Sequence, residues 1–180
     1  MKISNTASMS IFLLLFTSSA HAISHNTWED ISNYSVSTLS ATALFLPISR
    51  NDWQGFRQAA YSIGAAEGMA FLGKQAITEQ RPDHSGNDSF PSGHTSNAFA
   101  SATTIYRRYG WKIGAPAYVL ATLTGIGRVK SNKHHWYDVV VGAAIGSASG
   151  WYFTDAFNNK VQLIPWADTK SVGLTVSMRW

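Results

Sequence analysis

Hydrophobic and polar positions divide most of this chain into apolar stretches of helical length separated by short polar segments. The stretches are rich in Ala, Gly and aliphatic residues, and the segments between them carry Pro, Gly, Asn and Asp. Helices are predicted over residues 34–48, 53–78, 92–106, 113–127 and 135–157. The pattern therefore predicts an all-α fold, a helical bundle of about five core helices that occupies residues 23–159 as one domain.

Glycines recur within the predicted helices at spacings that favour close helix packing. Gly142, Gly146 and Gly150 are four residues apart, which places them on one face of the last helix. The helix over residues 53–78 is also rich in small residues, including Gly64 and Gly68. Since a face without side chains lets a neighbouring backbone approach closely, we expect tight helix contacts at these positions.

The last residues of the chain change from a helical to an alternating pattern. Apolar side chains alternate with small or polar ones at Val172, Leu174, Val176 and Met178. This is the period of a strand, so residues 160–180 are predicted to form a short C-terminal tail that is extended or hairpin-like.

The first residues resemble a secretory signal. Lys2 precedes a short apolar run over residues 11–16, and Ala20 to Ala22 fit the small-x-small pattern of a cleavage site. Residues 1–22 are therefore predicted to be a signal peptide, with an uncleaved anchor helix as the alternative. The mature protein is expected to be exported, and either periplasmic or membrane-associated with its functional site facing the periplasm.

Composition narrows the possible partners. With 45% hydrophobic and 13% charged residues and a mean hydropathy of −0.07, the chain lies between soluble and membrane proteins. The net charge of +4 suits anionic substrates or lipid head groups, but the basic residues are scattered and no nucleic-acid surface is indicated. The chain has no cysteines, which excludes disulfides and thiolate metal sites.

One motif carries a recognisable chemical pattern between Gly127 and Asp138, which read GRVKSNKHHWYD. His134 and Asp138 are four residues apart, a spacing that places them one turn apart on a helix. A carboxylate there can accept the proton of one imidazole nitrogen and leave the other nitrogen as a directed lone pair. Arg128, just upstream, suggests that the target is an anion.

Two earlier stretches give this motif a context. They are residues 74–82, KQAITEQRP, and residues 90–95, FPSGHT. In order and spacing, the three motifs resemble the signature of the type-2 phosphatidic acid phosphatase family, whose superfamily also includes bacterial class A acid phosphatases and vanadium haloperoxidases. The resemblance covers roughly residues 70–142. It departs from the family pattern at Gly127, where the family usually has Ser.

The resemblance implies roles for three catalytic residues. His134 would attack phosphorus and form a phosphohistidine, and Asp138 would orient the His134 ring. His94 would act as the general acid that protonates the leaving alkoxide and later helps to activate water.

The phosphate would be held by cationic side chains and a helix start. Lys74, Arg81 and Arg128 would surround it, with the arginines offering forked donors. Ser92 and the backbone N–H of Gly93 stand where a helix begins, and free amides at such a position favour an anion.

No metal and no cofactor is predicted. The cationic side chains would neutralise the phosphate, and they would oppose a metal ion held by His and Asp. Three further polar residues are interpreted without a catalytic role. His135 is read as structural or site-lining, His84 as a solvated loop residue and Glu67 as a surface or interhelical contact.

The sequence thus predicts a metal-independent phosphatase of phosphate monoesters or diphosphates. Lipid phosphates such as phosphatidic acid, phosphatidylglycerol phosphate, undecaprenyl diphosphate or a lipid A phosphate are favoured, because the FPSGH context resembles the lipid phosphatase branch. Two alternatives stay open, a soluble broad-specificity periplasmic acid phosphatase and a non-enzymatic envelope protein that binds lipid phosphates.

A membrane surface or bilayer is the expected partner, since the predicted helices separate the basic residues from the three motifs. The basic residues at the end away from the motifs are Arg50, Arg57, Arg107, Arg108 and Lys112. Such an asymmetry fits an outward-facing site. The many Ser, Thr and Asn residues within 93–106 argue against a membrane-spanning helix there.

Overall fold

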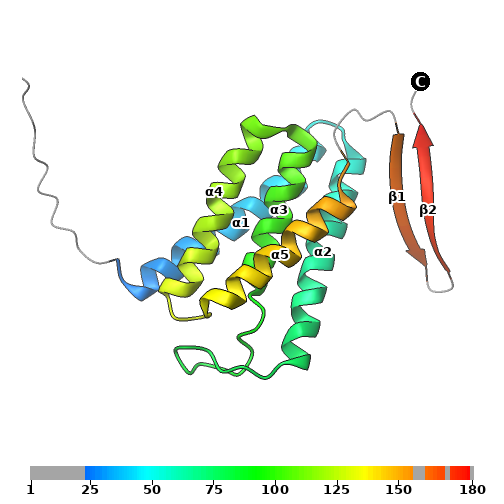
Figure 1. Cartoon of the computed structure of the whole chain (residues 1–180). Helices are drawn as coiled ribbons and strands as arrows, with labels where there is room; N and C mark the ends of the chain where they lie inside the picture. Colours follow the sequence, from blue (N-terminus) through cyan, green and yellow to red (C-terminus); the bar gives the residue numbers. More distant parts are fainter. Residues whose placement is uncertain (1–22, 156–160, 169–170, 179–180) are drawn as a thin grey trace, which may run out of the picture.

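The computed structural model describes residues 23–155, 161–168 and 171–178, which form a bundle of helices and a pair of strands (Figure 1). The predicted signal peptide over residues 1–22 lies outside the described residues. The helices are α1 His25–Ser49, α2 Trp53–Ala76, α3 Gly93–Tyr109, α4 Trp111–Lys130 and α5 Trp136–Phe153. The predicted fold class, an all-α bundle with a short strand tail, is confirmed.

α1, α2 and α3 begin after residues whose side chains cap free backbone amides. The Ser24 side chain accepts from the Thr27 N–H at 3.2 Å, and Asp52 Oδ1 accepts from the Gly55 N–H at 2.9 Å. α1 begins nine residues before the predicted start at 34. Its first turns are mainly polar, so the apolar pattern could not locate them.

The strands β1 Val161–Asp168 and β2 Ser171–Met178 pair antiparallel, with Val161 opposite Met178 and Asp168 opposite Ser171. This register agrees with the alternating pattern of the C-terminal residues. The two strands correspond to the predicted hairpin-like tail, and the buried hydrophobic cluster contains residues of the helices alone among those described.

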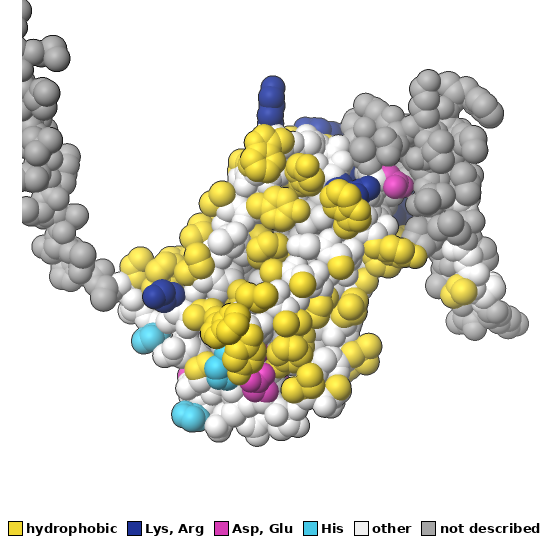
Figure 2. All heavy atoms as spheres, viewed as in Figure 1, with side chains coloured by type: hydrophobic (Ala, Val, Ile, Leu, Met, Phe, Trp, Pro, Cys, Tyr) yellow, Lys and Arg dark blue, Asp and Glu magenta, His cyan; other side chains and the backbone are white. Residues whose placement is uncertain are grey.

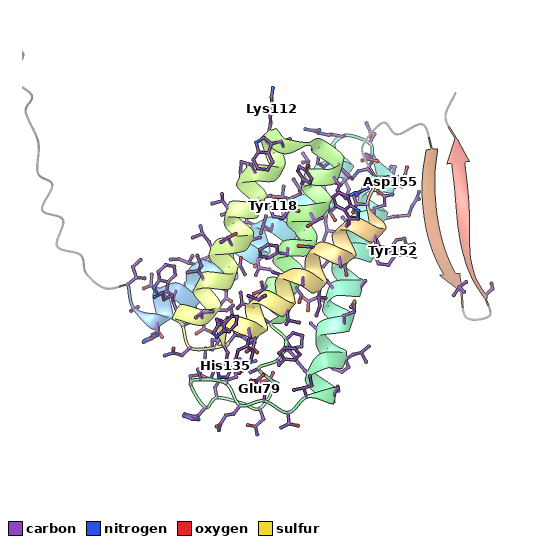
Figure 3. The ribbon with its side chains drawn as sticks, in the orientation of Figure 1. Glu79, Lys112, Tyr118, His135, Tyr152 and Asp155 are labelled. Atoms are coloured by element: carbon purple, nitrogen blue, oxygen red, sulfur yellow. The ribbon has the colours of Figure 1, made fainter. Side chains whose placement is uncertain are left out.

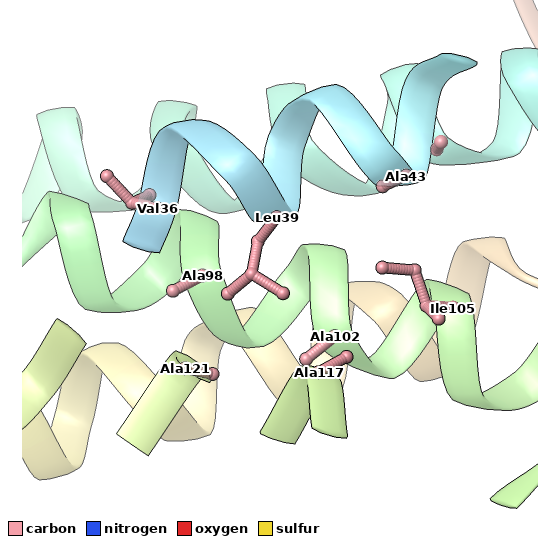
Figure 4. Close-up of a cluster of buried hydrophobic side chains, with 9 residues drawn as sticks. Val36, Leu39, Ala43, Ala98, Ala102, Ile105, Ala117 and Ala121 are labelled. Atoms are coloured by element: carbon pink, nitrogen blue, oxygen red, sulfur yellow. The ribbon is translucent and has the colours of Figure 1, made fainter. Parts of the chain in front are cut away.

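α3 is the central helix of the bundle and packs against the other four helices (Figure 1). The core around it is built mainly of alanines, with Leu39 and Ile105 as its largest buried apolar side chains (Figure 4). Buried Ser and Thr side chains fill much of the remaining interior. A core of such small residues requires the helix axes to lie close together, so its cohesion depends on close van der Waals contact.

The glycines of α5 produce the closest of these approaches. A Cβ on Gly146 would lie 2.1 Å from the carbonyl oxygen of Ser96, and one on Gly142 would lie 2.6 Å from that of Ser92. The predicted glycine stripe therefore packs on α3. The prediction was wrong for Gly64 and Gly68, since a Cβ at either position would meet nothing within 4 Å.

A buried ionic cluster closes the end of the bundle away from the three motifs. Arg108 is 4% exposed. Its guanidinium pairs with Asp52 and donates to Gln58 Oε1 at 2.6 Å and to the Asp155 carbonyl at 3.1 Å. Asp155 and Lys112 are labelled at this end in Figure 3. The structure thus keeps the predicted separation between the basic residues and the motifs.

The outer surface of the bundle carries many large apolar side chains, visible over α4 and α5 in Figure 2. More than half of the residue surface is exposed at Trp111 (69%), Trp136 (67%), Trp151 (61%) and Val119 (61%). Within the described residues, no helix combines the length and the apolar character that a membrane span requires.

The glycine contacts predict opposite effects for two equivalent substitutions. Gly146→Ala should lower the free energy of unfolding by about 1–3 kcal/mol, because the new methyl group would meet backbone atoms of α3 that cannot move freely. Gly64→Ala should raise it by about 1 kcal/mol, because alanine favours the helix and the site is open. Urea unfolding of both variants measures the difference, and equal effects would contradict this account of the packing.

Candidate active site

The three motifs meet at the end of the bundle opposite the ionic cluster. α2 ends there, α3 and α5 begin there, and α4 ends there, so the loops between these helices lie together (Figure 1). Figure 3 labels Glu79 and His135 at this end. The polar loop over residues 77–92 is tied to the next loop by the Lys133–Asp83 ion pair at 2.9 Å and by the Asp83 N–H, which donates to the Asn132 carbonyl.

The loop between α4 and α5 explains the spacing between Arg128 and His134. The Arg128 carbonyl accepts from the backbone N–H groups of both Lys133, at 3.0 Å, and His134, at 3.2 Å. Asn132 allows the chain to turn back, with a φ of 58°, a conformation that Asn adopts more readily than most residues. The five intervening residues therefore return His134 to the helix end that carries Arg128.

The loop after α2 positions the first two cations. Arg81 pairs with Asp88 through two parallel hydrogen bonds, Nε to Oδ1 at 2.9 Å and Nη2 to Oδ2 at 3.0 Å. The Lys74 ammonium donates to the Asp88 carbonyl. Asp88 thus orients both side chains, a role that its place in the linear sequence does not reveal.

These elements enclose a pocket of about 320 Å³. Its lining contains six of the eight predicted site residues together with Glu67. The lining residues are Glu67, Lys74, Arg81, Gly93, His94, Arg128 and His134. The volume lies at the lower end of the range for small-ligand sites, which suits a phosphate and the atoms next to it.

Asp138 and Ser92 are fully buried behind this lining rather than in it. The Ser92 N–H donates to the Asp138 carbonyl at 3.1 Å, and the Ser92 hydroxyl lies 2.9 Å from that of Thr95. The hydroxyl caps α3, so Ser92 shapes the pocket through the start of this helix. Direct contact between the Ser92 hydroxyl and phosphate stays a prediction. The burial of this hydroxyl and its contact with Thr95 do not favour it.

His134 and Asp138 approach each other, although not on one helix as the spacing suggested. His134 precedes α5, whose N-cap is His135, while Asp138 lies in the first turn. His134 Nδ1 is 3.5 Å from Asp138 Oδ2, which also accepts from the Ser89 hydroxyl at 2.5 Å and from the His135 N–H at 2.8 Å. Catalytic hydrogen bonds are often this long before substrate binds.

His135 lies closer to Asp138 than its position in the motif predicts. Its Nδ1 is also 3.5 Å from Asp138 Oδ2, and it is 3.7 Å from Glu79 Oε1. The ring stacks on Tyr137, whose pKa is raised to about 12 by its hydrogen bond to Glu79. Glu79, His135 and Asp138 have ligand atoms within 4.8 Å of one another, a grouping that could hold a metal ion.

His94 is held between α1 and α3. Its Nε2 lies 3.0 Å from Oδ1 of Asn33, which accepts the imidazole proton. Burial lowers the pKa of His94 to about 4, and the positive charges of Arg128, Arg81 and Lys74 add to the effect. In the free protein at neutral pH, His94 is therefore an uncharged imidazole.

The other groups of the pocket experience the same combination of burial and positive charge. Burial, and then Arg128, lower the pKa of His134, while Asp138 opposes the shift. Burial also lowers the pKa of Lys74 and of Arg128. Among the described residues, Arg128 Nε is buried without a hydrogen-bond partner. The pocket is thus an electropositive site with unused donors, as binding of an anion requires.

Gly127, the one departure from the motif pattern, has a packing reason. A Cβ at this position would lie 2.8 Å from both the Ser32 Cβ and the Trp28 carbonyl of α1. α1 therefore occupies the space that a serine side chain would need, and it approaches Arg128 from that side.

Four residues of the site were missed or were given no role by sequence reasoning, namely Asn33, Glu67, Asp88 and Ser89. Asp88 and Ser89 lie in the loop between two motifs, so their proximity to the site was a usable signal. Asn33 comes from α1, outside all three motifs, and nothing in the linear sequence connects it to His94.

Comparison with known proteins agrees with the fold and the motifs. The model of the PAP2 superfamily matches residues 55–162. This match covers more than half of the chain and all three motifs, so the chain belongs to the PAP2 superfamily. The resemblance noted from the sequence is thereby confirmed.

Two curated relatives are phosphatases by name. The chain is 41% identical over 94 residues to the lipid A 1-phosphatase of Porphyromonas gingivalis, covering 51% of this chain but only 21% of that protein. It is 29% identical over 134 residues to the lipid A 4'-phosphatase of Helicobacter pylori, covering 64% of this chain and 68% of that protein. These relatives support the predicted class, a phosphoric ester hydrolase.

Two solved structures share the fold. The crystal structure of Aquifex aeolicus LpxE has a TM-score of 0.64 at 22% identity and covers 75% of this chain and 87% of that chain. The transmembrane PAP2 type phosphatidylglycerolphosphate phosphatase of Bacillus subtilis has a TM-score of 0.58 at 22% identity, covering 72% and 74%.

The electrostatics of the pocket predict that inorganic phosphate raises the pKa of His94 by one unit or more. Burial and nearby positive charges together lower this pKa to about 4 in the free protein, and the bound anion would offset the contribution of the charges. An NMR titration of the imidazole signals, with and without phosphate, measures the shift. The signals of His84, an exposed loop residue outside the pocket, should not respond. A His94 pKa that stays constant or falls would contradict this account.

Proposed function

We propose that this protein is a metal-independent lipid phosphatase that acts through a phosphohistidine on His134. The observation that supports the proposal most directly is the composition of the pocket. Three cations and two histidines line one cavity, and a buried carboxylate stands behind one of the histidines. Binding of phosphate alone would need the cations but not a histidine paired with a carboxylate.

The first step is charge neutralisation. Lys74, Arg81 and Arg128 would contact the phosphate oxygens, and the N–H of Gly93 at the start of α3 would add a fourth donor. Arg128 Nε is buried and has no hydrogen-bond partner among the described residues, so this donor is available to the phosphate. Positioning and electrostatic stabilisation provide most of the catalysis in phosphoryl transfer.

The second step is attack by His134. Because Nδ1 lies toward Asp138, the lone pair of Nε2 is left to form the N–P bond as the P–O bond to the alcohol breaks. The lowered pKa of His134 keeps the ring unprotonated, and therefore nucleophilic, in mildly acidic solution. Asp138 would stabilise the positive ring of the phosphohistidine.

The third step is proton transfer through His94. Bound phosphate would raise the pKa of His94, so the ring would take up a proton and donate it to the leaving alkoxide. The neutral ring would then accept a proton from water, whose oxygen forms the new bond to phosphorus as the N–P bond breaks. The products are the alcohol and inorganic phosphate. When the phosphate leaves, the pKa of His94 falls again and the ring releases its proton to solvent, so both histidines return to their starting states.

Lipid phosphates are proposed as the substrates, for two reasons. The curated relatives named above are lipid A phosphatases, and the Arabidopsis thaliana lipid phosphate phosphatase 1 is 34% identical over 109 residues. The bundle also exposes tryptophans and aliphatic side chains that suit contact with a membrane. The protein would be exported and membrane-associated, with the site facing the periplasm.

Phosphate release by the purified full chain tests the proposal. Phosphatidic acid, undecaprenyl diphosphate and p-nitrophenyl phosphate would be compared in the presence of EDTA. Release should survive chelation, because side chains neutralise the phosphate, and His134→Ala should reduce kcat by about a thousandfold or more. A preference for p-nitrophenyl phosphate over both lipids would favour a soluble acid phosphatase.

The matched control is His84→Ala, since this exposed histidine lies outside the pocket and should be dispensable. Full activity of folded His134→Ala, or loss of activity with EDTA, would contradict the mechanism. No release from any substrate by the folded protein would leave lipid-phosphate binding as the better account.

A further inference from the structure

Among the described residues that line the cationic pocket, Glu67 is the one with an acidic side chain, and the proposed mechanism does not use it. It lies on α2, seven residues before Lys74, and its side chain is exposed to the pocket and to solvent. Within the described part of the chain it makes no ion pair with Lys74, Arg81 or Arg128. Its negative charge therefore remains available to whatever enters the pocket.

A chain of hydrogen bonds holds the Glu67 carboxylate in place. Asn97 Nδ2 donates to Glu67 Oε1 at 3.0 Å, while Asn97 Oδ1 accepts from Ser40 at 2.6 Å and from Ser101 at 3.3 Å. These hydrogen bonds link α1, α2 and α3. An acceptor fixed from three helices loses little side-chain entropy when a ligand binds to it.

The second carboxylate oxygen lies beside the start of α3. Glu67 Oε2 is 3.5 Å from the position that a Cβ of Gly93 would occupy. Gly93 and His94 begin the helix that would contact the phosphate and protonate the leaving oxygen. The chemical group attached to that oxygen would therefore lie within reach of the carboxylate.

We propose that Glu67 determines substrate specificity by selecting the group attached to the transferred phosphate. The inference rests on the proposed phosphatase function and deepens it. The carboxylate accepts hydrogen bonds from a hydroxyl or ammonium group of the substrate alcohol, and it repels a second phosphate at the same place. The preferred substrates are then phosphate monoesters of hydroxylated or amino alcohols, in preference to diphosphates.

Three substrates separate these effects in the full chain. Lysophosphatidic acid carries a free hydroxyl near its phosphate, dodecyl phosphate carries no donor on its alkyl chain, and farnesyl diphosphate carries a second phosphate. Glu67→Gln keeps an acceptor for Asn97 and removes the charge. It should lower the kcat/KM ratio of lysophosphatidic acid to dodecyl phosphate about tenfold, the scale of one hydrogen bond to a charged group.

The same variant should raise the ratio of farnesyl diphosphate to dodecyl phosphate by about tenfold, because the repulsion is removed. Glu67→Asp keeps the charge, so its kcat/KM ratio of farnesyl diphosphate to dodecyl phosphate should stay closer to that of the wild type. The matched control is Asp30→Asn, which removes one charge from an exposed position on α1 and should change neither ratio.

The outcomes separate this inference from the function on which it rests. Wild-type release with both ratios unchanged, within about twofold, in Glu67→Gln would overturn the role of Glu67 and leave the phosphatase intact. An equal change in Asp30→Asn would also overturn it, because the effect would then be one of net charge. No release of phosphate by the wild type from any of the three substrates would instead refute the phosphatase function.

Discussion

The arrangement of the site depends on the buried carboxylate of Asp138. Its backbone carbonyl accepts from Ser92, which begins α3, and its side chain accepts from Ser89 and from the backbone of His135. The same carboxylate lies 3.5 Å from His134. One residue therefore joins the loop after α2, the start of α3 and the start of α5. An anion that is 0% exposed is costly unless such partners compensate it. Loss of these contacts would separate the three motifs and would also displace His134.

The second constraint is the excess of positive charge around the pocket. Asp88 offsets part of it by pairing with Arg81. Burial, with the remaining cations adding to its effect, still lowers the pKa values of Lys74, His94 and His134. The free protein therefore holds both histidines unprotonated, a state that suits a nucleophile but not an acid. On this account, an anionic substrate supplies the missing negative charge and converts His94 to its acid form. Binding and protonation would then be coupled through one electrostatic field.

Much of the fold and the site could be predicted from the sequence, because both depend on local patterns. Apolar stretches located five helices, and the motif spacings brought six of the eight predicted residues into one pocket. The parts that could not be predicted depend on packing between distant segments. Asn33 reaches His94 across 61 positions, and α1 fills the space beside Gly127. His135 reaches Asp138 because the helix begins at that residue, which helix spacing alone does not show.

The central claim is that phosphate passes through a covalent bond to His134. The most direct measurement is rapid acid-free quenching of the wild-type protein with a ³²P-labelled lipid phosphate, followed by localisation of the label. The account predicts a label that is stable to base and labile to acid, and that maps to His134. In His94→Ala the label should form more slowly and also decay more slowly, because His94 is the acid of the first transfer and the base of the second. A wild-type protein that turns over substrate without labelling His134, or a label on another residue, would contradict the account.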